Sequence, residues 1–293
     1  MPDKAAVPKV WTVLSMLDWA TAYFEGKGIN QPRLSIEWLL ADTLGCKRLD
    51  LYLQFDRLLH TKELSALKPA LLRRAAHEPL QYITGKTDFY GLEMKVGPDV
   101  LIPRPETEQL VELICNDISD RQNLRVLDIG TGSGCIAIAL KTERPDFSLA
   151  AADISERALA IAMKNAATHD CEIDFFRHDL FQPRLPDDRA PFDVIVSNPP
   201  YIPLSEKQHI DAEVSKFEPA EALFHQNVRS VYGALGRLAQ ANLRAGGVLY
   251  VEIHEEMGEE ISKAVAEHGF SVALMPDYAG KSRMLVCSQQ SNS

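Results

Sequence analysis

Residues 126–134 of this 293-residue chain read Val-Leu-Asp-Ile-Gly-Thr-Gly-Ser-Gly, and this stretch indicates the fold. A short apolar run enters a turn with three alternate glycines, and a helical pattern starts near Cys135. Such glycines let backbone amides approach a ligand closely at the carboxyl edge of an open α/β sheet. The stretch therefore predicts a buried strand, a ligand-binding turn and a helix. The residues expected to contact the ligand are Gly130, Thr131, Gly132, Ser133 and Gly134.

Two other interpretations of this turn remain open on its sequence alone. A dinucleotide site would have the spacing Gly-x-Gly-x-x-Gly, whereas here the third glycine comes one residue early, which disfavours NAD. The turn could also be a tight connection between strand and helix without a ligand.

The chain after residue 106 alternates short hydrophobic runs with amphipathic helical patterns, which is typical of a parallel sheet covered by helices. A closing pair at the end resembles a sheet whose last strand is antiparallel. We predict a Rossmann-like domain with seven strands, at residues 124–129, 148–153, 173–177, 192–197, 247–253, 270–275 and 283–287.

The chain before this domain has a different texture. Apolar residues at helical spacing over residues 10–76 predict a small bundle of four or five helices. From Pro79 onward, short β-type runs at residues 81–85 and 89–96 predict a β-hairpin linker. The expected division is a helical domain at 1–78, a linker at 79–105 and the Rossmann-like domain at 106–293.

Composition and charge restrict the classes of function. No apolar run approaches the roughly 20 residues of a membrane helix, and no signal peptide is evident, so we expect a cytoplasmic protein without membrane contact. The five cysteines are widely separated without a Cys-x-x-Cys pair, and no metal is expected. Residues 106–293 contain 17 basic and 29 acidic residues, a net charge of −12, which disfavours binding to nucleic acid.

Acidic residues follow the next two predicted strands. Asp153 ends the strand at 148–153, where a carboxylate can accept hydrogen bonds from both hydroxyls of a ribose. Asp153 could instead cap the following helix, a role that Ser155 could also fill. Asp179 follows the strand at 173–177 and is placed to bind an adenine amino group, with Leu180 packing on the ring.

A second turn motif, Ser-Asn-Pro-Pro-Tyr at residues 197–201, follows the fourth predicted strand. Two prolines make the turn rigid, so that Asn198 and Tyr201 are held at the sheet edge. If the side-chain oxygen of Asn198 and the carbonyl of Pro199 both accept from a substrate NH₂, they orient a poorly nucleophilic amide nitrogen and stabilise its developing positive charge. Tyr201 could pack on the amide face, or the whole motif could be a proline-rich turn without chemistry.

Together these motifs resemble S-adenosylmethionine (AdoMet)-dependent methyltransferases that modify exocyclic or amide nitrogens. Asn-Pro-Pro-Tyr is shared by amino-adenine DNA methyltransferases and by glutamine methyltransferases. Further segments separate the two and resemble the HemK/PrmC family, the peptide chain release factor glutamine methyltransferases. These segments lie at residues 79–85, 89–92, 100–108 and 217–223, and the most specific is Ile-Pro-Arg-Pro-Glu-Thr-Glu at 102–108.

The resemblance implies a class I methyltransferase fold, AdoMet as cofactor with S-adenosylhomocysteine as product, and methylation of the N5 atom of the glutamine in a Gly-Gly-Gln loop of release factors. It implies Asn198, Pro199 and Tyr201 as catalytic residues, Pro200 with them at the substrate, and Asn198 beside the cofactor as well. The alternatives are a glutamine methyltransferase of a large-subunit ribosomal protein, an amino-adenine DNA methyltransferase, and an AdoMet-binding regulatory module.

Three features around these motifs have no single interpretation from the sequence. The chain departs from the usual family sequence at residues 225–229 and at His254, where glycine is usual. Arg104 and Glu106 have two interpretations, as functional residues or as an ion pair that ties the linker to the sheet.

Overall fold

The computed structural model of the chain describes residues 8–186, 189 and 191–289. The contacts between residues divide it into two compact units. One unit extends to Gly85 and also includes Asp211–Phe217, and the other holds Lys86–Ile210 and the chain from Glu218 onward. No helix among the described residues is long and apolar enough to cross a membrane.

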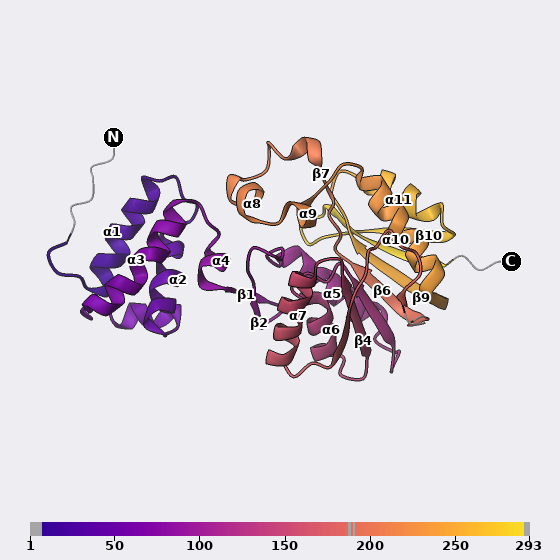
Figure 1. Cartoon of the computed structure of the whole chain (residues 1–293), viewed down its shortest axis with the longest axis horizontal. Helices are drawn as coiled ribbons and strands as arrows, with labels where there is room; N and C mark the ends of the chain where they lie inside the picture. Colours follow the sequence, from indigo (N-terminus) through magenta and orange to yellow (C-terminus); the bar gives the residue numbers. More distant parts are fainter. Residues whose placement is uncertain (1–7, 187–188, 190, 290–293) are drawn as a thin grey trace. The chain divides into compact units, whose positions relative to one another are not determined.

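The first unit is a small helical bundle, whose part up to Gly85 is drawn in indigo and purple in Figure 1 and whose short segment Asp211–Phe217 is drawn in orange. Its first helix begins after a capping box in which Thr12 Oγ1 accepts from the Ser15 amide and Ser15 Oγ accepts from the Thr12 amide. Its core contains apolar side chains such as Leu17, Phe24 and Ile36. The elements are α1 (Val13–Glu25), α2 (Pro32–Leu44), the 3₁₀ helix η1 (Arg48–Leu53), α3 (Thr61–Ala75), α4 (Leu80–Thr84) and α8 (Ala212–Phe217).

The strand expected at residues 81–85 is wrong, because this stretch forms the single-turn helix α4. The hydroxyl of Thr84 donates back to the carbonyl of Leu80, and Gly85 ends the helix with a left-handed φ of 76°. A run of five residues is too short for periodicity to distinguish a strand from one helical turn. The second half of the predicted linker does form a hairpin, β1 (Lys86–Phe89) with β2 (Leu92–Lys95), paired antiparallel.

The second unit contains the predicted seven-stranded sheet, in the order β10-β11-β9-β6-β3-β4-β5. The strand that comes last in the chain, β11, is antiparallel to both neighbours, whereas β9, β6, β3, β4 and β5 pair parallel, which confirms the predicted fold class. The strands are β3 (Arg125–Ile129), β4 (Ser148–Asp153), β5 (Ile173–Arg177), β6 (Phe192–Ser197), β9 (Leu243–Glu252), β10 (Phe270–Pro276) and β11 (Ser282–Gln289).

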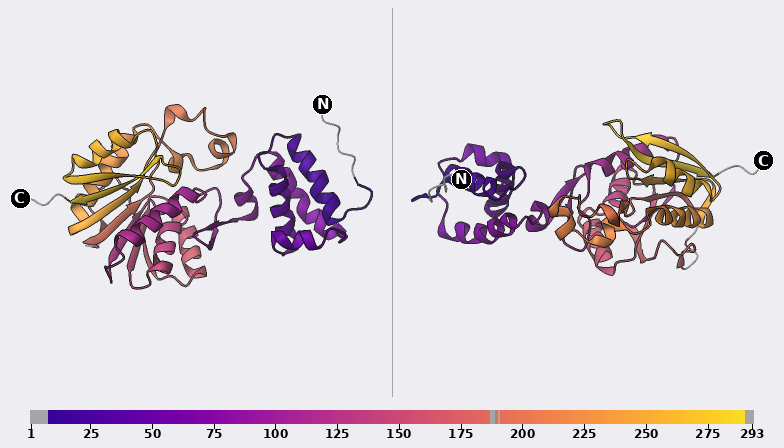
Figure 2. Two further views of the ribbon diagram at one scale, coloured as in Figure 1. Left: turned by 180° about the vertical axis from the view of Figure 1, so that it is seen from behind. Right: turned by 90° about the horizontal axis from the view of Figure 1, so that it is seen from above.

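Helices cover both faces of this sheet (Figures 1 and 2). Successive residues of one strand enter opposite cores: Val126 packs with α5, α6 and α7, and Leu127 packs with α10 and α11. The helices are α5 (Pro105–Asp117), α6 (Cys135–Glu143), α7 (Glu156–Thr168), α10 (Val228–Asn242) and α11 (Gly258–Ala266), and short elements after β6 are β7 (Ile202–Pro203), η3 (Leu204–Glu206), α9 (Ala220–Leu223) and β8 (Phe224–His225).

Candidate active site

The glycine turn connects β3 to α6, as predicted from its sequence. Gly130, Gly132 and Gly134 have φ values of 73°, 55° and 83°, in the left-handed region that favours glycine. At Gly134 a Cβ atom would also lie 3.1 Å from the Cβ of Ala162, so this glycine is required by close packing on α7 as well. The turn is thus held in one conformation at the carboxyl edge of the sheet.

Asp153 lies at the end of β4 and supports the turn. Its Oδ2 accepts from the Gly132 amide at 2.9 Å, and its Oδ1 accepts from the Ser155 amide at 2.9 Å. The cap of α7 belongs to Ser155, whose Oγ accepts from the Ala158 amide at 3.2 Å. Burial raises the pKa of Asp153, and its backbone donors oppose this shift. Because each oxygen uses only one acceptor direction, further acceptor capacity remains for a ligand.

A cavity of about 490 Å³ opens at this edge of the sheet. Most of the predicted site residues line it together, and two do not: among the described residues, Gly134 and Tyr201 are absent from its wall. The predicted residues that line it are Gly130, Thr131, Gly132, Ser133, Asp153, Asp179, Leu180, Asn198, Pro199 and Pro200.

Two buried oxygens in the cavity wall, Ser133 Oγ and Asn198 Oδ1, have no hydrogen-bond partner among the described residues. Such groups are rare in folded proteins and usually mark a missing ligand or water. The cavity also combines carboxylates for hydroxyl and amino donors, Asp153 and Asp179, with the apolar side chain of Leu180. This donor and acceptor set fits a nucleoside with a polar tail, as AdoMet has.

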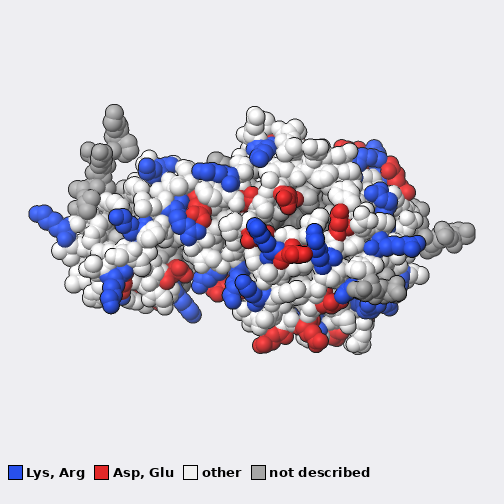
Figure 3. All heavy atoms as spheres, viewed as in Figure 1, with Lys and Arg blue, Asp and Glu red and all other residues white. Residues whose placement is uncertain are grey.

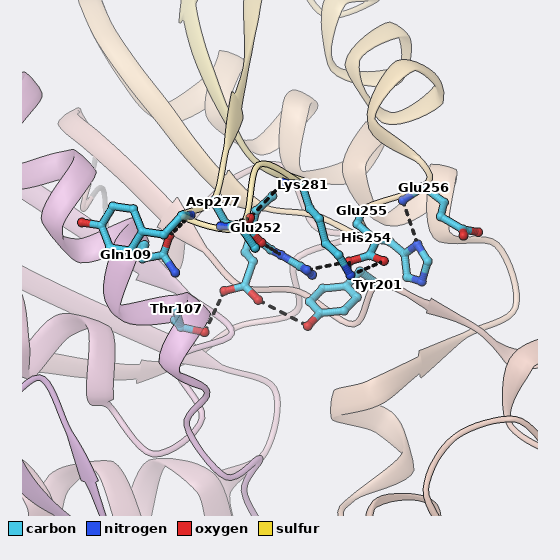
Figure 4. Close-up of polar contacts among 12 residues, drawn as sticks. Thr107, Gln109, Tyr201, Glu252, His254, Glu255, Glu256, Asp277 and Lys281 are labelled. Atoms are coloured by element: carbon cyan, nitrogen blue, oxygen red, sulfur yellow. Dashed lines mark hydrogen bonds and ion pairs between the residues drawn. The ribbon is translucent and has the colours of Figure 1, made fainter.

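The side-chain amide of Asn198 is anchored at its nitrogen. Nδ2 donates to the Oγ1 of Thr107 at 3.0 Å, and Thr107 donates to the carboxylate of Glu252 at 2.7 Å. The hydroxyl of Tyr201 donates to the other oxygen of Glu252 at 3.3 Å (Figure 4). The hydroxyl of Tyr201 is therefore directed at the buried Glu252, and Tyr201 does not line the cavity.

Glu252, the carboxylate that both hydroxyls contact, is fully buried. Burial raises the pKa of its carboxyl to about 7, although hydrogen bonds from Thr107 and Tyr201 and the charge of Arg283 lower it. No sequence pattern indicated this role of Glu252 beyond a carboxylate near the end of a predicted strand. Thr107 was likewise seen only as part of the segment 102–108.

Comparison with known proteins matches the two parts of the chain to two families. The PrmC N-terminal domain family matches residues 15–85, and the methyltransferase small domain family matches residues 106–268, more than half of the chain. The release factor glutamine methyltransferase of Chlorobaculum tepidum is 40% identical over 99% of this chain and 100% of its own length.

The chain belongs to the release factor glutamine methyltransferase family. A second member, from Geobacter sulfurreducens, is 40% identical over 90% of this chain and 91% of its own. Among solved structures, a methyltransferase from Pyrococcus furiosus is similar in fold, with a TM-score of 0.51, 18% identity, and coverage of 69% of this chain and 91% of that one. The cofactor of this family is AdoMet, as predicted.

Arg104, in the most specific segment of the family resemblance, forms its ion pair with a different partner from the one considered. Its Nη2 lies 2.6 Å from Oε1 of Glu218, and Oε2 of Glu218 accepts from the Ile102 amide at 3.1 Å. Glu106 lies in the first turn of α5 instead, where a carboxylate is favourable beside the helix N-terminus. The ion pair with Glu106 is therefore wrong, and Glu218 is the residue that ties this segment down.

Glu218→Gln should lower the free energy of unfolding by about 1.5 kcal/mol, the lower end for a hydrogen bond to a charged group, because Arg104 keeps some solvent contact. Gln retains an acceptor for the Ile102 amide, so the loss reports the ion pair. Urea unfolding of this variant and of Glu156→Gln, which breaks an exposed ion pair with Arg177, provides the comparison. Equal stability of the two variants would contradict this role of Glu218.

The two departures from the usual family sequence lie around the same site. His225 lines the cavity, and its ring stacks on Phe181 at 5.7 Å between centroids. His254 packs edge-on against Tyr201, with 6.3 Å between the ring centroids, and its Nε2 lies 3.6 Å from Glu206. His225 is therefore part of the cavity wall, and His254 contacts Tyr201.

Proposed function

We propose that this chain methylates the side-chain amide nitrogen of the glutamine in the Gly-Gly-Gln loop of a peptide chain release factor. One observation carries the proposal at the site: the buried, unpartnered Oδ1 of Asn198 lines the cavity beside the glycine turn. An amide NH₂ of the substrate would supply the hydrogen-bond donor for this oxygen. The names of the relatives support the same substrate.

AdoMet supplies an activated methyl group when it is bound. We propose that Asp153 accepts from its ribose, that Asp179 accepts from its adenine, and that Leu180 packs on the ring. Asn198 Oδ1 and the Pro199 carbonyl accept from the substrate NH₂, so the nitrogen's remaining lone pair is oriented for attack. Bound AdoMet would supply the methyl carbon and keep the electrons of the broken carbon–sulfur bond as S-adenosylhomocysteine, and the methylated amide would lose its extra proton to water.

Charge supports a protein substrate rather than duplex DNA. Residues 106–293 have a net charge of −12. On the face drawn in Figure 3, Lys and Arg are interspersed with Asp and Glu. A duplex-binding surface needs a continuous basic track for the phosphates. We propose that nucleic acid and membrane play no part, and that the protein acts in the cytoplasm with its release factor.

A competition assay tests the proposed function. The protein is incubated with methyl-labelled AdoMet and equal amounts of a release factor, a large-subunit ribosomal protein and duplex DNA containing adenine. We expect label on the release factor alone, and none when its Gly-Gly-Gln glutamine is replaced by leucine. Preferential label on the ribosomal protein or on DNA would overturn the proposal.

We also propose that residues 1–78 recognise the protein substrate, because all the predicted cofactor residues lie after residue 125. A shortened chain beginning at Pro79 should still bind AdoMet, while its kcat/KM for intact release factor falls about tenfold, equivalent to roughly 1.4 kcal/mol. A short Gly-Gly-Gln peptide is the control, since both proteins should methylate it equally. Equal kcat/KM on intact release factor would refute this division of roles.

A further inference from the structure

A continuous chain of hydrogen bonds joins three side chains from separate elements: Asn198 and Thr107 line the cavity, and Glu252 is fully buried behind them. Asn198 follows β6, Thr107 lies in the first turns of α5, and Glu252 ends β9. The chain runs from Asn198 Nδ2 to Thr107 Oγ1 at 3.0 Å and from Thr107 Oγ1 to Glu252 Oε2 at 2.7 Å. Figure 4 shows the hydroxyls of Thr107 and Tyr201 directed at the two oxygens of Glu252.

The direction of this chain follows from the chemistry of a hydroxyl group, which has one proton to donate. A carboxylate at Glu252 can only accept, so the Thr107 proton is directed at it. Thr107 Oγ1 then offers only lone pairs to Asn198, which must present its NH₂. The Asn198 oxygen is therefore left free, which agrees with its lack of a partner.

We propose that Thr107 and Glu252 are positioning residues that set which end of the Asn198 amide faces the substrate. The inference rests on the proposed role of Asn198 as an acceptor for the glutamine NH₂. If the amide were turned over, its NH₂ would meet the substrate NH₂, donor against donor, and the nitrogen would not be oriented. Neither positioning residue needs to touch substrate or AdoMet to have this effect.

We call the hydrogen-bonded chain Glu252–Thr107–Asn198 the relay. The ionisation of Glu252 gives this relay a pH dependence with a defined sign. The pKa of this carboxyl is raised to about 7, so the carboxylate is lost as the pH falls through that value. A protonated Glu252 can donate to Thr107 Oγ1. The Thr107 hydroxyl can then donate to Asn198, so the Asn198 amide can turn over and bond to Thr107 through its oxygen. The other ionisable groups around it are Arg283 on β11, Glu106 on α5, Tyr201 after β6, Tyr232 on α10 and Cys135 on α6.

A double-mutant cycle between Thr107 and Asn198 tests the proposal. Thr107→Val removes the hydroxyl with little change in shape, and kcat for release factor should fall about tenfold, the effect of one hydrogen bond, while the Kd for AdoMet stays within twofold. Thr107→Ser retains the hydroxyl and should restore kcat to within about threefold of wild type. In the Asn198→Ala background, Thr107→Val should have no further effect, because the group that it orients is gone.

The pH profile provides a second arm. In the wild type, kcat should fall on the acid side with an apparent pKa near 7. Glu252→Gln should be slower and should lose this acid limb. Tyr232→Phe is the matched control, because its buried hydroxyl donates at 2.8 Å to the backbone carbonyl of Glu252 and not to the relay, so both the limb and kcat should remain.

The outcomes distinguish the relay from the proposed function. An equal loss from Thr107→Val in both backgrounds, or wild-type kcat in Thr107→Val, would overturn the relay while release factor is still methylated. Loss of the acid limb in Tyr232→Phe would do the same. If the wild type fails to label release factor, or Asn198→Ala is fully active, the proposed function or its mechanism fails first.

Discussion

Replacing Asn198 with alanine should slow methylation of release factor by about 10²- to 10³-fold, the usual loss when one preorganised electrostatic group is removed. The Kd for AdoMet should change far less, since the buried Oδ1 is proposed to accept from the substrate NH₂ rather than to hold the cofactor. Single-turnover rates with labelled AdoMet, together with calorimetric titration of the cofactor, separate the two effects. A folded, AdoMet-binding variant with the wild-type rate would exclude the acceptor mechanism.

Asn198→Asp is the matched substitution, because it keeps an acceptor and removes the NH₂ that donates to Thr107. We expect a rate between those of wild type and Asn198→Ala. The added carboxyl also lies near the buried Glu252, and two such groups oppose each other's ionisation. The rate of this variant should therefore rise with pH more steeply than that of the wild type.

Asp153→Ala should weaken AdoMet binding by about 2–3 kcal/mol, or about 30- to 150-fold in Kd, because it deletes charge-assisted acceptors for the ribose. The same change frees the Gly132 amide, so the turn also loses its support. Calorimetric titration of the folded variant measures the loss.

Ser155→Ala is the control for the helix cap. It removes the Oγ that accepts from the Ala158 amide and should lower the free energy of unfolding by about 1 kcal/mol. AdoMet affinity should stay within about threefold of wild type, because no charged acceptor is lost. If Ser155→Ala and Asp153→Ala weaken binding equally, the ribose assignment of Asp153 is wrong.

Local sequence pattern was sufficient for most of the sheet. The predicted bounds of β4, β5 and β6 agree with the structure, because each is a short apolar run that ends at a polar residue or turn. For β9 the prediction began at Gly247, four residues late, since the exposed residues 244–246 do not resemble a buried strand. The helix α4 was missed for a different reason, because a run of five residues is too short to show a helical period.

The residues that hold the site together could not be found in this way. Thr107 and Glu252 lie 145 positions apart, and Arg104 and Glu218 lie 114 apart. Only the tertiary fold brings such pairs together, and a lone carboxylate at a strand end gives no indication of burial or of a raised pKa. The cofactor turn and the Asn-Pro-Pro-Tyr motif were visible because their residues are consecutive in the chain.

The inclusion of Asp211–Phe217 in the helical unit has a consequence for synthesis on the ribosome. Arg74, almost fully buried, bonds to Ser35 within the bundle but also pairs with Glu213 at 2.8 Å. During translation the bundle must wait for well over a hundred further residues before this partner emerges. Until then the guanidinium of Arg74 lacks its carboxylate partner, and burying it unpaired would be costly. The first unit to be made is thus among the last to be completed, and nascent-chain proteolysis should show its protection rising only after residue 217 has left the exit tunnel.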